Sequence, residues 1–166
     1  HIYWSTNHEE KFSKFPKKNQ EEIENELSNL VDDSVRSRMI SDVPLGVMLS
    51  GGIDSSLVAA IAQKFSKKKI DTFSISFPQK GFDESKYAKK VAQKLSCSHN
   101  TFSIDDYYLE DLIEKIPYHY DEPFGDSSQI PSLIIAKELK KKVTVALTGD
   151  GGDEIFGGYT RYVWGE

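Results

Sequence analysis

Apolar runs alternate along the chain with amphipathic segments, and this pattern predicts the order of the secondary-structure elements. Residues 19–39 place apolar side chains one helical turn apart, begin with the capping pair Asn19 and Glu22, and are expected to form a helix. Apolar strands are expected at residues 43–49, 70–77, 99–104 and 143–148, with helices at 54–66, 83–95, 106–116 and 127–140 and a loop at 117–126. Strands that alternate with helices predict an α/β fold: an open, mainly parallel sheet with helices on both faces.

The segment at residues 50–56, Ser-Gly-Gly-Ile-Asp-Ser-Ser, lies between the first expected strand and a helix. Its adjacent glycines allow positive φ and close approach to a ligand, and the helix N-terminus offers N–H groups to an anion. Ser50, Ser55 and Ser56 add hydroxyl donors, and Asp54 adds a carboxylate that can bind a metal ion. Neither the lysine of the G-x-x-x-x-G-K-[ST] loop nor the G-x-G-x-x-G pattern is present. The segment predicts a phosphate site of a less common kind, with an ordinary helix cap as the alternative.

A second glycine-rich segment, Thr-Gly-Asp-Gly-Gly-Asp-Glu at residues 148–154, follows the last expected strand. Its three carboxylates repel one another in a low dielectric unless a cation or a proton lies among them. A solvent-exposed acidic turn explains the segment equally well when it is taken alone. Because the carboxyl ends of parallel strands meet at one edge, the two segments together predict a single site, with Asp54 and Asp153 as Mg²⁺ ligands.

The composition is that of a globular protein: 166 residues, 38% hydrophobic and 28% charged, enough for one domain with a core. No apolar run approaches the ~20 residues of a membrane span, so no membrane partner is expected. The single cysteine, Cys97, is typical of a reducing compartment and predicts a cytoplasmic protein. The net charge of −5 argues against a nucleic-acid partner. Lysine runs at residues 67–69 and 140–142 end expected helices, where cations complement the helix dipole.

The loop at residues 50–56 resembles the PP-loop of the ATP pyrophosphatases, which split ATP between its α- and β-phosphates. Together with Thr-Gly-Asp-Gly-Gly-Asp-Glu-Ile-Phe-Gly-Gly-Tyr at residues 148–159, it makes the chain resemble the synthetase domain of the glutamine-dependent asparagine synthetases from about residue 3 to 162. The resemblance implies a Rossmann-like fold and the cofactors ATP and Mg²⁺. For ATP and pyrophosphate it implies Leu49, Ser50, Gly51, Gly52, Asp54, Ser55, Ser56, Ile75, Thr148 and Gly149, and for the metal Asp54 and Asp153.

The same resemblance implies the chemistry. Aspartate or a similar carboxylate attacks the α-phosphate, pyrophosphate leaves, and ammonia then displaces AMP from the acyl-adenylate to form an amide. Asp150 stands where the family commonly has a glutamate that takes a proton from the incoming ammonia. Aspartate can act as a general base, but its shorter side chain changes the geometry.

The resemblance also predicts the domain organisation. Residues 1–18 are expected to be a linker from an N-terminal glutaminase domain, the source of ammonia, and residues 19–166 a truncated synthetase domain. The chain begins with His1 rather than Met, and the family's downstream catalytic lysine would fall beyond Glu166, so the fragment alone is expected to be inactive. The full-length protein could form a homodimer.

Three alternatives remain open from the sequence. A relative could amidate another carboxylate, such as a sugar acid or a peptide, and the segment at residues 121–128 is expected to help choose the substrate. A PP-loop enzyme that modifies tRNA should show a basic face or thiol chemistry, which Cys97 alone and the net charge of −5 do not favour. The third is a protein without catalysis, either a nucleotide-binding module or a regulatory partner.

Overall fold

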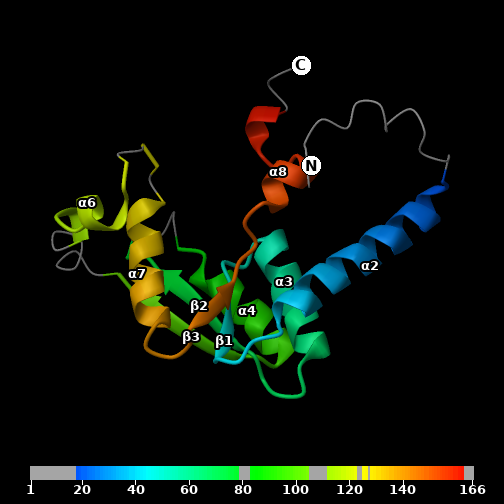
Figure 1. Ribbon diagram of the computed structural model, residues 1–166, viewed down its shortest axis with the longest axis horizontal. Helices are drawn as coiled ribbons and strands as arrows, with labels where there is room; N and C mark the ends of the chain where they lie inside the picture. The colour runs from blue at the N-terminus through cyan, green and yellow to red at the C-terminus, as the bar shows by residue number, and fades with distance from the viewer. Residues whose placement is uncertain (1–17, 79–82, 105–111, 123–124, 127, 163–166) are drawn as a thin grey trace, which may run out of the picture. The chain divides into compact units, whose positions relative to one another are not determined.

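The computed structural model describes residues 18–78, 83–104, 112–122, 125–126 and 128–162 (Figure 1). The chain divides into two compact units, His1–Ser34 and Val35–Glu166, which are described separately. Most of the expected linker at residues 1–18 and most of the expected helix at residues 106–116 lie outside the described residues. No helix within the described ranges is both long and apolar enough to cross a membrane.

The described part of the first unit is the greater part of helix α2 (Gln20–Arg38), which begins where the sequence predicts. The capping pair is formed: Asn19 Oδ1 accepts from the Glu22 amide, and Glu22 Oε2 accepts from the Asn19 amide, each at 2.9 Å. The two bonds satisfy amide groups that a helix start otherwise leaves without partners. The apolar stripe Ile23, Leu27 and Leu30 is exposed in the structure.

The second unit contains a four-stranded sheet in the order β3-β2-β1-β4, formed by Ser98–Ser103, Asp71–Ser76, Leu45–Met48 and Val145–Leu147. Every neighbouring pair of strands is parallel, which confirms the predicted fold class. Gly46 of β1 lies opposite Asp71 of β2 on one side and Ala146 of β4 on the other, so β1 is central.

Helices cover both faces of this sheet (Figure 1). On one face α7 (Gln129–Leu139) packs on β2, where Phe73 forms a buried cluster with Leu139 and Val143. Along a strand, successive side chains point to opposite faces, so Thr72 and Ser74 face the other way. That side is covered by α3 (Ile53–Phe65) and α4 (Ser85–Leu95), which contact each other and the strands.

The structure corrects the expected boundaries in two places. Strands β1, β2 and β4 are shorter than the apolar runs, although the Leu49 amide still donates to the Phe73 carbonyl at 2.8 Å beyond the end of β1. Within the expected loop at residues 117–126, the structure has a short helix, α6 (Ile116–His119). Pro117 is tolerated there because the first turn of a helix does not use its amide groups.

Candidate functional site

The two glycine-rich segments lie next to each other at the carboxyl edge of the sheet. The first, at residues 50–56, leads from the end of β1 into the first turn of α3, and the second begins at Thr148, directly after β4. The chain runs from β1 outward through β2 to β3, whereas β4 returns to the opposite side of β1. The strand order therefore reverses between β1 and β4, and open α/β sheets bind ligands in the crevice outside such a reversal.

Hydroxyl groups hold the first glycine loop in place. Ser55 Oγ lies 2.9 Å from Ser50 Oγ and accepts from the Ser50 amide at 3.2 Å, while Ser50 Oγ accepts from the Gly52 amide at 3.2 Å. Gly52 is the N-cap of α3, so the loop ends where the first turn of this helix presents its amide groups. The sequence predicted these serines as ligand donors, and the structure adds that two of them order the loop.

Gly51 shows why the loop needs glycine. It has a φ of +93°, and a β-carbon there would lie 2.6 Å from the Ala88 amide nitrogen and 2.7 Å from the Tyr87 β-carbon. Both the positive φ and the close approach to the first turns of α4 exclude a larger side chain. The loop is thus packed on α4, a neighbour that the motif did not reveal.

The second glycine loop contacts the first through backbone atoms. A β-carbon at Gly149 would lie 2.8 Å from the Ser55 amide nitrogen and 3.1 Å from the Asp54 carbonyl carbon. One at Gly152 would lie 2.5 Å from Asp54 Oδ2. The Asp54 carboxylate is therefore directed at the start of α8 (Gly152–Phe156), and the two segments form a single constellation.

The other predicted carboxylates lie on or beside α8. Asp153 is in the first turn of α8, and its Oδ1 atom lies against Gly158. Asp150 is exposed, and its amide donates to Thr148 Oγ1 at 3.4 Å. Among the residues that the structure describes, no three His, Cys, Asp or Glu side chains come together as a group that could hold a metal ion. A metal at this site would accordingly take much of its coordination from phosphate oxygens and water, as Mg²⁺ commonly does.

The remaining predicted residues lie around the same edge. Ser56 Oγ is buried and has no hydrogen-bond partner within the described part of the chain. The Leu49 side chain is buried in the core, and Ile75 of β2 packs against a cluster with Ile104 and Ile134. Leu49 and Ile75 thus use their side chains for packing, which leaves backbone groups to contact a nucleotide.

The sequence did not indicate that Tyr159 interacts with Glu154 and Arg161. The Tyr159 hydroxyl donates to Glu154 Oε1 at 2.6 Å, and the Arg161 guanidinium lies 4.1 Å from the Tyr159 ring centre. The hydrogen bond lowers the pKa of the Glu154 carboxyl and raises the pKa of Tyr159. The spacing of five residues gives no helical signal, because Gly157 ends α8 between them.

A further polar cluster lies between β2 and β3, on the face that α4 covers. His99 Nδ1 is 2.9 Å from Thr72 Oγ1, and its Nε2 is 3.2 Å from both Ser74 Oγ and Thr101 Oγ1. Burial, together with the charge of Lys89, holds the pKa of His99 below its ordinary value. The sequence showed only an isolated histidine, since two of its three partners, Thr72 and Ser74, are on a strand more than 20 residues away.

Comparisons with known proteins agree with this architecture. The family model described as Asparagine synthase matches residues 26–165. The glutamine-hydrolysing asparagine synthetase 1 of Bacillus subtilis is 43% identical over 86% of this chain and 22% of its own length. Asparagine synthetase B of Escherichia coli is 32% identical over 83% of this chain and 27% of its own length. The chain therefore spans about a quarter of the length of these curated relatives.

One solved structure shows the same fold. The NH3-dependent NAD synthetase from Campylobacter jejuni superposes with a TM-score of 0.53 over 86% of this chain and 61% of that chain, at 16% sequence identity. At that identity the likeness concerns the fold alone. The family match, which covers most of the chain, goes further: this protein belongs to the asparagine synthase family.

Proposed function

We propose that this chain activates a carboxylate with ATP, as the PP-loop part of a cytoplasmic, glutamine-dependent asparagine synthetase. The observation that carries the proposal is the contact between the two glycine loops, in which Gly149 and Gly152 pack against Asp54 and Ser55. This contact brings hydroxyls, the amide end of α3 and carboxylates together at one edge of the sheet. Such a set of groups matches the needs of a polyphosphate that is cleaved with a metal ion.

The first loop would hold the phosphates and then the leaving pyrophosphate. The amide groups at the start of α3 stabilise negative charge, and the Ser50–Ser55 pair holds these groups in position. Ser56 Oγ supports this assignment because a buried hydroxyl without a partner is costly until a ligand satisfies it. Thr148 and Gly149 would border the nucleotide from the second loop.

Mg²⁺ fits the donor set, since Asp54 and Asp153 contribute hard carboxylate oxygens to this edge. Asp54 is directed at the turn that carries Asp153, which is where a shared ion would be held. When bound, the ion supplies positive charge that offsets the charge developing on pyrophosphate. Asp54 and Asp153 would position the ion. Asp150 would not bind it, which leaves the Asp150 carboxylate available for proton transfer.

The proposed reaction has two steps. A carboxylate oxygen of aspartate bonds to the α-phosphorus while the bond to the β-phosphate oxygen breaks. Ammonia, produced by a glutaminase domain of the longer protein, then bonds to the acyl carbon, AMP leaves with the bonding electrons, and Asp150 accepts the surplus proton. Asp150 is exposed, which leaves its carboxylate accessible to a diffusing amine.

The test uses the full-length protein with ATP, Mg²⁺, aspartate and either glutamine or ammonia. Asparagine and AMP should appear in equal amounts, and AMP without asparagine would contradict the choice of acceptor. Asp150→Asn should still exchange labelled pyrophosphate into ATP when aspartate is present but form little asparagine, and Asp150→Glu should restore amide formation. Loss of exchange in Asp150→Asn would place this residue in the first step and overturn its assigned role.

A further inference from the structure

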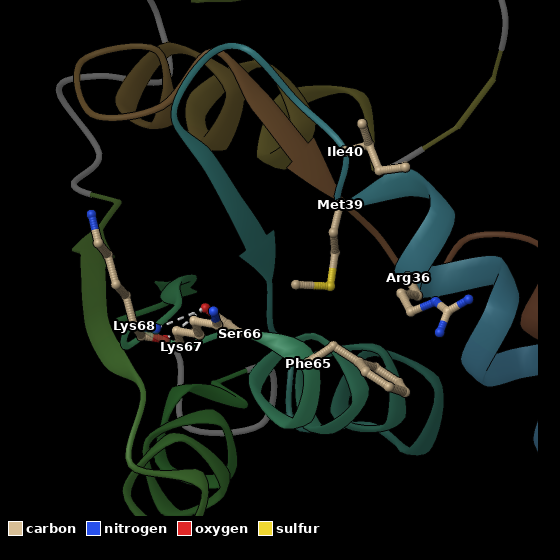
Figure 2. A pocket seen from close by; sticks show the side chains of 7 residues that line it. All are labelled: Arg36, Met39, Ile40, Phe65, Ser66, Lys67 and Lys68. Carbon is tan, nitrogen blue, oxygen red and sulfur yellow. Dashed lines mark hydrogen bonds between the residues drawn. The ribbon is translucent and has the colours of Figure 1, made fainter.

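A second surface feature lies at the amino edge of the sheet, on the side opposite to the glycine loops. It is an open pocket of about 440 Å³, lined by Arg36, Met39, Ile40, Phe65, Ser66, Lys67 and Lys68. Figure 2 shows Met39 pointing into the space between the end of α2 and the end of α3. We call these seven residues the basic apolar pocket.

The lysines alone have a simple explanation, but the pocket does not. Lys67 and Lys68 follow the end of α3, where cations are favourable beside the helix carbonyl groups. That explanation leaves the apolar part unaccounted for: Ile40 is 87% exposed and Phe65 is 38% exposed. Exposed apolar residues gathered in one hollow and bordered by polar ones are typical of an interaction surface.

The walls of the pocket are ordered before any partner binds. Ser66 Oγ donates to the Lys68 carbonyl at 2.8 Å and accepts from the Lys68 amide at 3.1 Å, and the Gln63 side chain donates to the same carbonyl at 3.1 Å. Across the pocket, the Arg36 guanidinium lies 5.7 Å from the Phe65 ring centre. A preformed surface loses little conformational entropy when it is covered, which favours docking.

The charge of the pocket selects the chemistry of its partner. None of its seven residues is acidic and three are cationic, although the chain as a whole has a net charge of −5. Over the described ranges, neither Lys67 nor Lys68 forms an ion pair with a carboxylate of this chain. An acidic polypeptide with an aliphatic or aromatic side chain complements both the cations and the apolar floor.

The size of the pocket decides where that polypeptide comes from. Independent partners form stable complexes through roughly 20–30 residues a side, far more than the seven that line this pocket. A tethered segment needs much less surface, because a covalent connection gives an effective concentration of about millimolar. The related synthetases are about four times longer than the stretch that matches this chain, so family members have additional polypeptide available.

We propose that the basic apolar pocket is the docking site for an acidic segment of the same polypeptide, from the part of the full-length protein outside residues 1–166. The segment places an apolar side chain against Met39, Ile40 and Phe65 and carboxylates against Lys67 and Lys68. This docking is separate from the chemistry at the glycine loops. It therefore stands or falls independently of the proposed reaction.

Zero-length carbodiimide cross-linking of the full-length protein tests the proposal, because the reagent joins only amines and carboxylates in direct contact. A mixture of ¹⁴N- and ¹⁵N-labelled protein distinguishes links within one chain from links between two copies. We expect Lys67 or Lys68 to be joined, within one chain, to an Asp or Glu outside residues 1–166. Lys141 and Glu138 serve as the internal control, since their side chains are 2.6 Å apart.

Three results would overturn the docking proposal. The first is a mixed-isotope link from Lys67 or Lys68, which would join two copies of the chain. The second is a set of links from these lysines that reaches only residues 1–166. The third is the absence of any link from these lysines while Lys141 and Glu138 are joined. A variant then tests the apolar part: Ile40→Ser should lower the yield of the Lys67 and Lys68 links about fivefold. The matched control is Tyr118→Ser, which changes a similarly exposed residue elsewhere, and equal yields in the two variants would remove Ile40 from the docking surface.

Discussion

The two edges of the sheet differ in what brings their residues together. At the carboxyl edge, Gly149 and Gly152 allow one loop to pack its backbone directly on Asp54 and Ser55 of the other. At the amino edge, the basic apolar pocket is open and is bordered by the long side chains of Arg36, Lys67 and Lys68. At the first edge close-packed backbone atoms cannot give way, whereas at the second the hydrogen bonds of Ser66 and Gln63 order the backbone and side chains form the open surface.

This difference indicates which edge of the sheet tolerates amino-acid substitutions. Backbone contacts fix positions to within a fraction of an ångström, as catalysis requires, since small misplacements lower rates strongly. Contacts through flexible cationic side chains hold a partner by charge and apolar burial, and each contributes modestly.

Gly149→Ala should be the most damaging single change. Its methyl group would lie 2.8 Å from the Ser55 amide nitrogen, a backbone atom that cannot rotate away, so the two loops must separate. We expect a loss of about 1–3 kcal/mol in the free energy of unfolding and a fall of about 100-fold in kcat/KM for ATP. Gly125→Ala is the stability control because nothing lies within 4 Å of its added methyl group. Equal unfolding midpoints for the two variants would contradict the rigid contact.

Asp54→Asn should leave the fold intact and weaken the dependence on metal. The amide keeps the shape of the side chain beside Gly152 but removes the negative charge that attracts a cation. The Mg²⁺ concentration needed for half-maximal ATP–pyrophosphate exchange should rise at least about tenfold. Asp42→Asn, a change at an exposed position outside the glycine loops, is the charge-matched control. An unchanged Mg²⁺ requirement in Asp54→Asn would remove Asp54 from the metal site.

His99, in strand β3, should make the free energy of unfolding depend on pH. Its pKa is lowered in the folded protein, mainly by burial, so the unfolded chain binds more protons as the pH falls through about 6.5. The contribution of His99 to stability is therefore complete above about pH 6.5 and is lost progressively as the pH falls toward the lowered pKa. Urea unfolding at several pH values should show this slope.

His99→Gln should flatten that slope. His119→Gln, a change at an exposed histidine, should leave it in place. A slope that persists unchanged in His99→Gln would show that other groups cause the pH dependence.

Tyr159→Phe should have the smallest effect. The variant removes the donor to Glu154 Oε1, so the pKa of the Glu154 carboxyl should rise toward its ordinary value. A carboxyl-resolved NMR titration measures this directly, and the thermal midpoint should change little because Glu154 is exposed and Tyr159 is only partly buried. A Glu154 titration that is the same with and without the tyrosine hydroxyl would show that the bond does not persist in solution.

Much of the fold followed from local patterns. The helix beginning after Asn19 and the parallel strands around β1 lie where periodicity and capping residues predicted them. The short helix at Ile116–His119 was missed because four residues are too few to show a periodic apolar stripe. The partners of His99 were missed because cross-strand pairs join distant segments that no local pattern connects.

The sequence by itself determined the family, the order of strands and helices, and the two glycine-rich segments, because these depend on residue types at short spacing. The tertiary structure alone decided that β4 pairs beside β1, that Gly149 touches Ser55, and that Met39 and Phe65 share a pocket. These features depend on how the segments pack in three dimensions, and packing brings together residues that lie far apart along the chain.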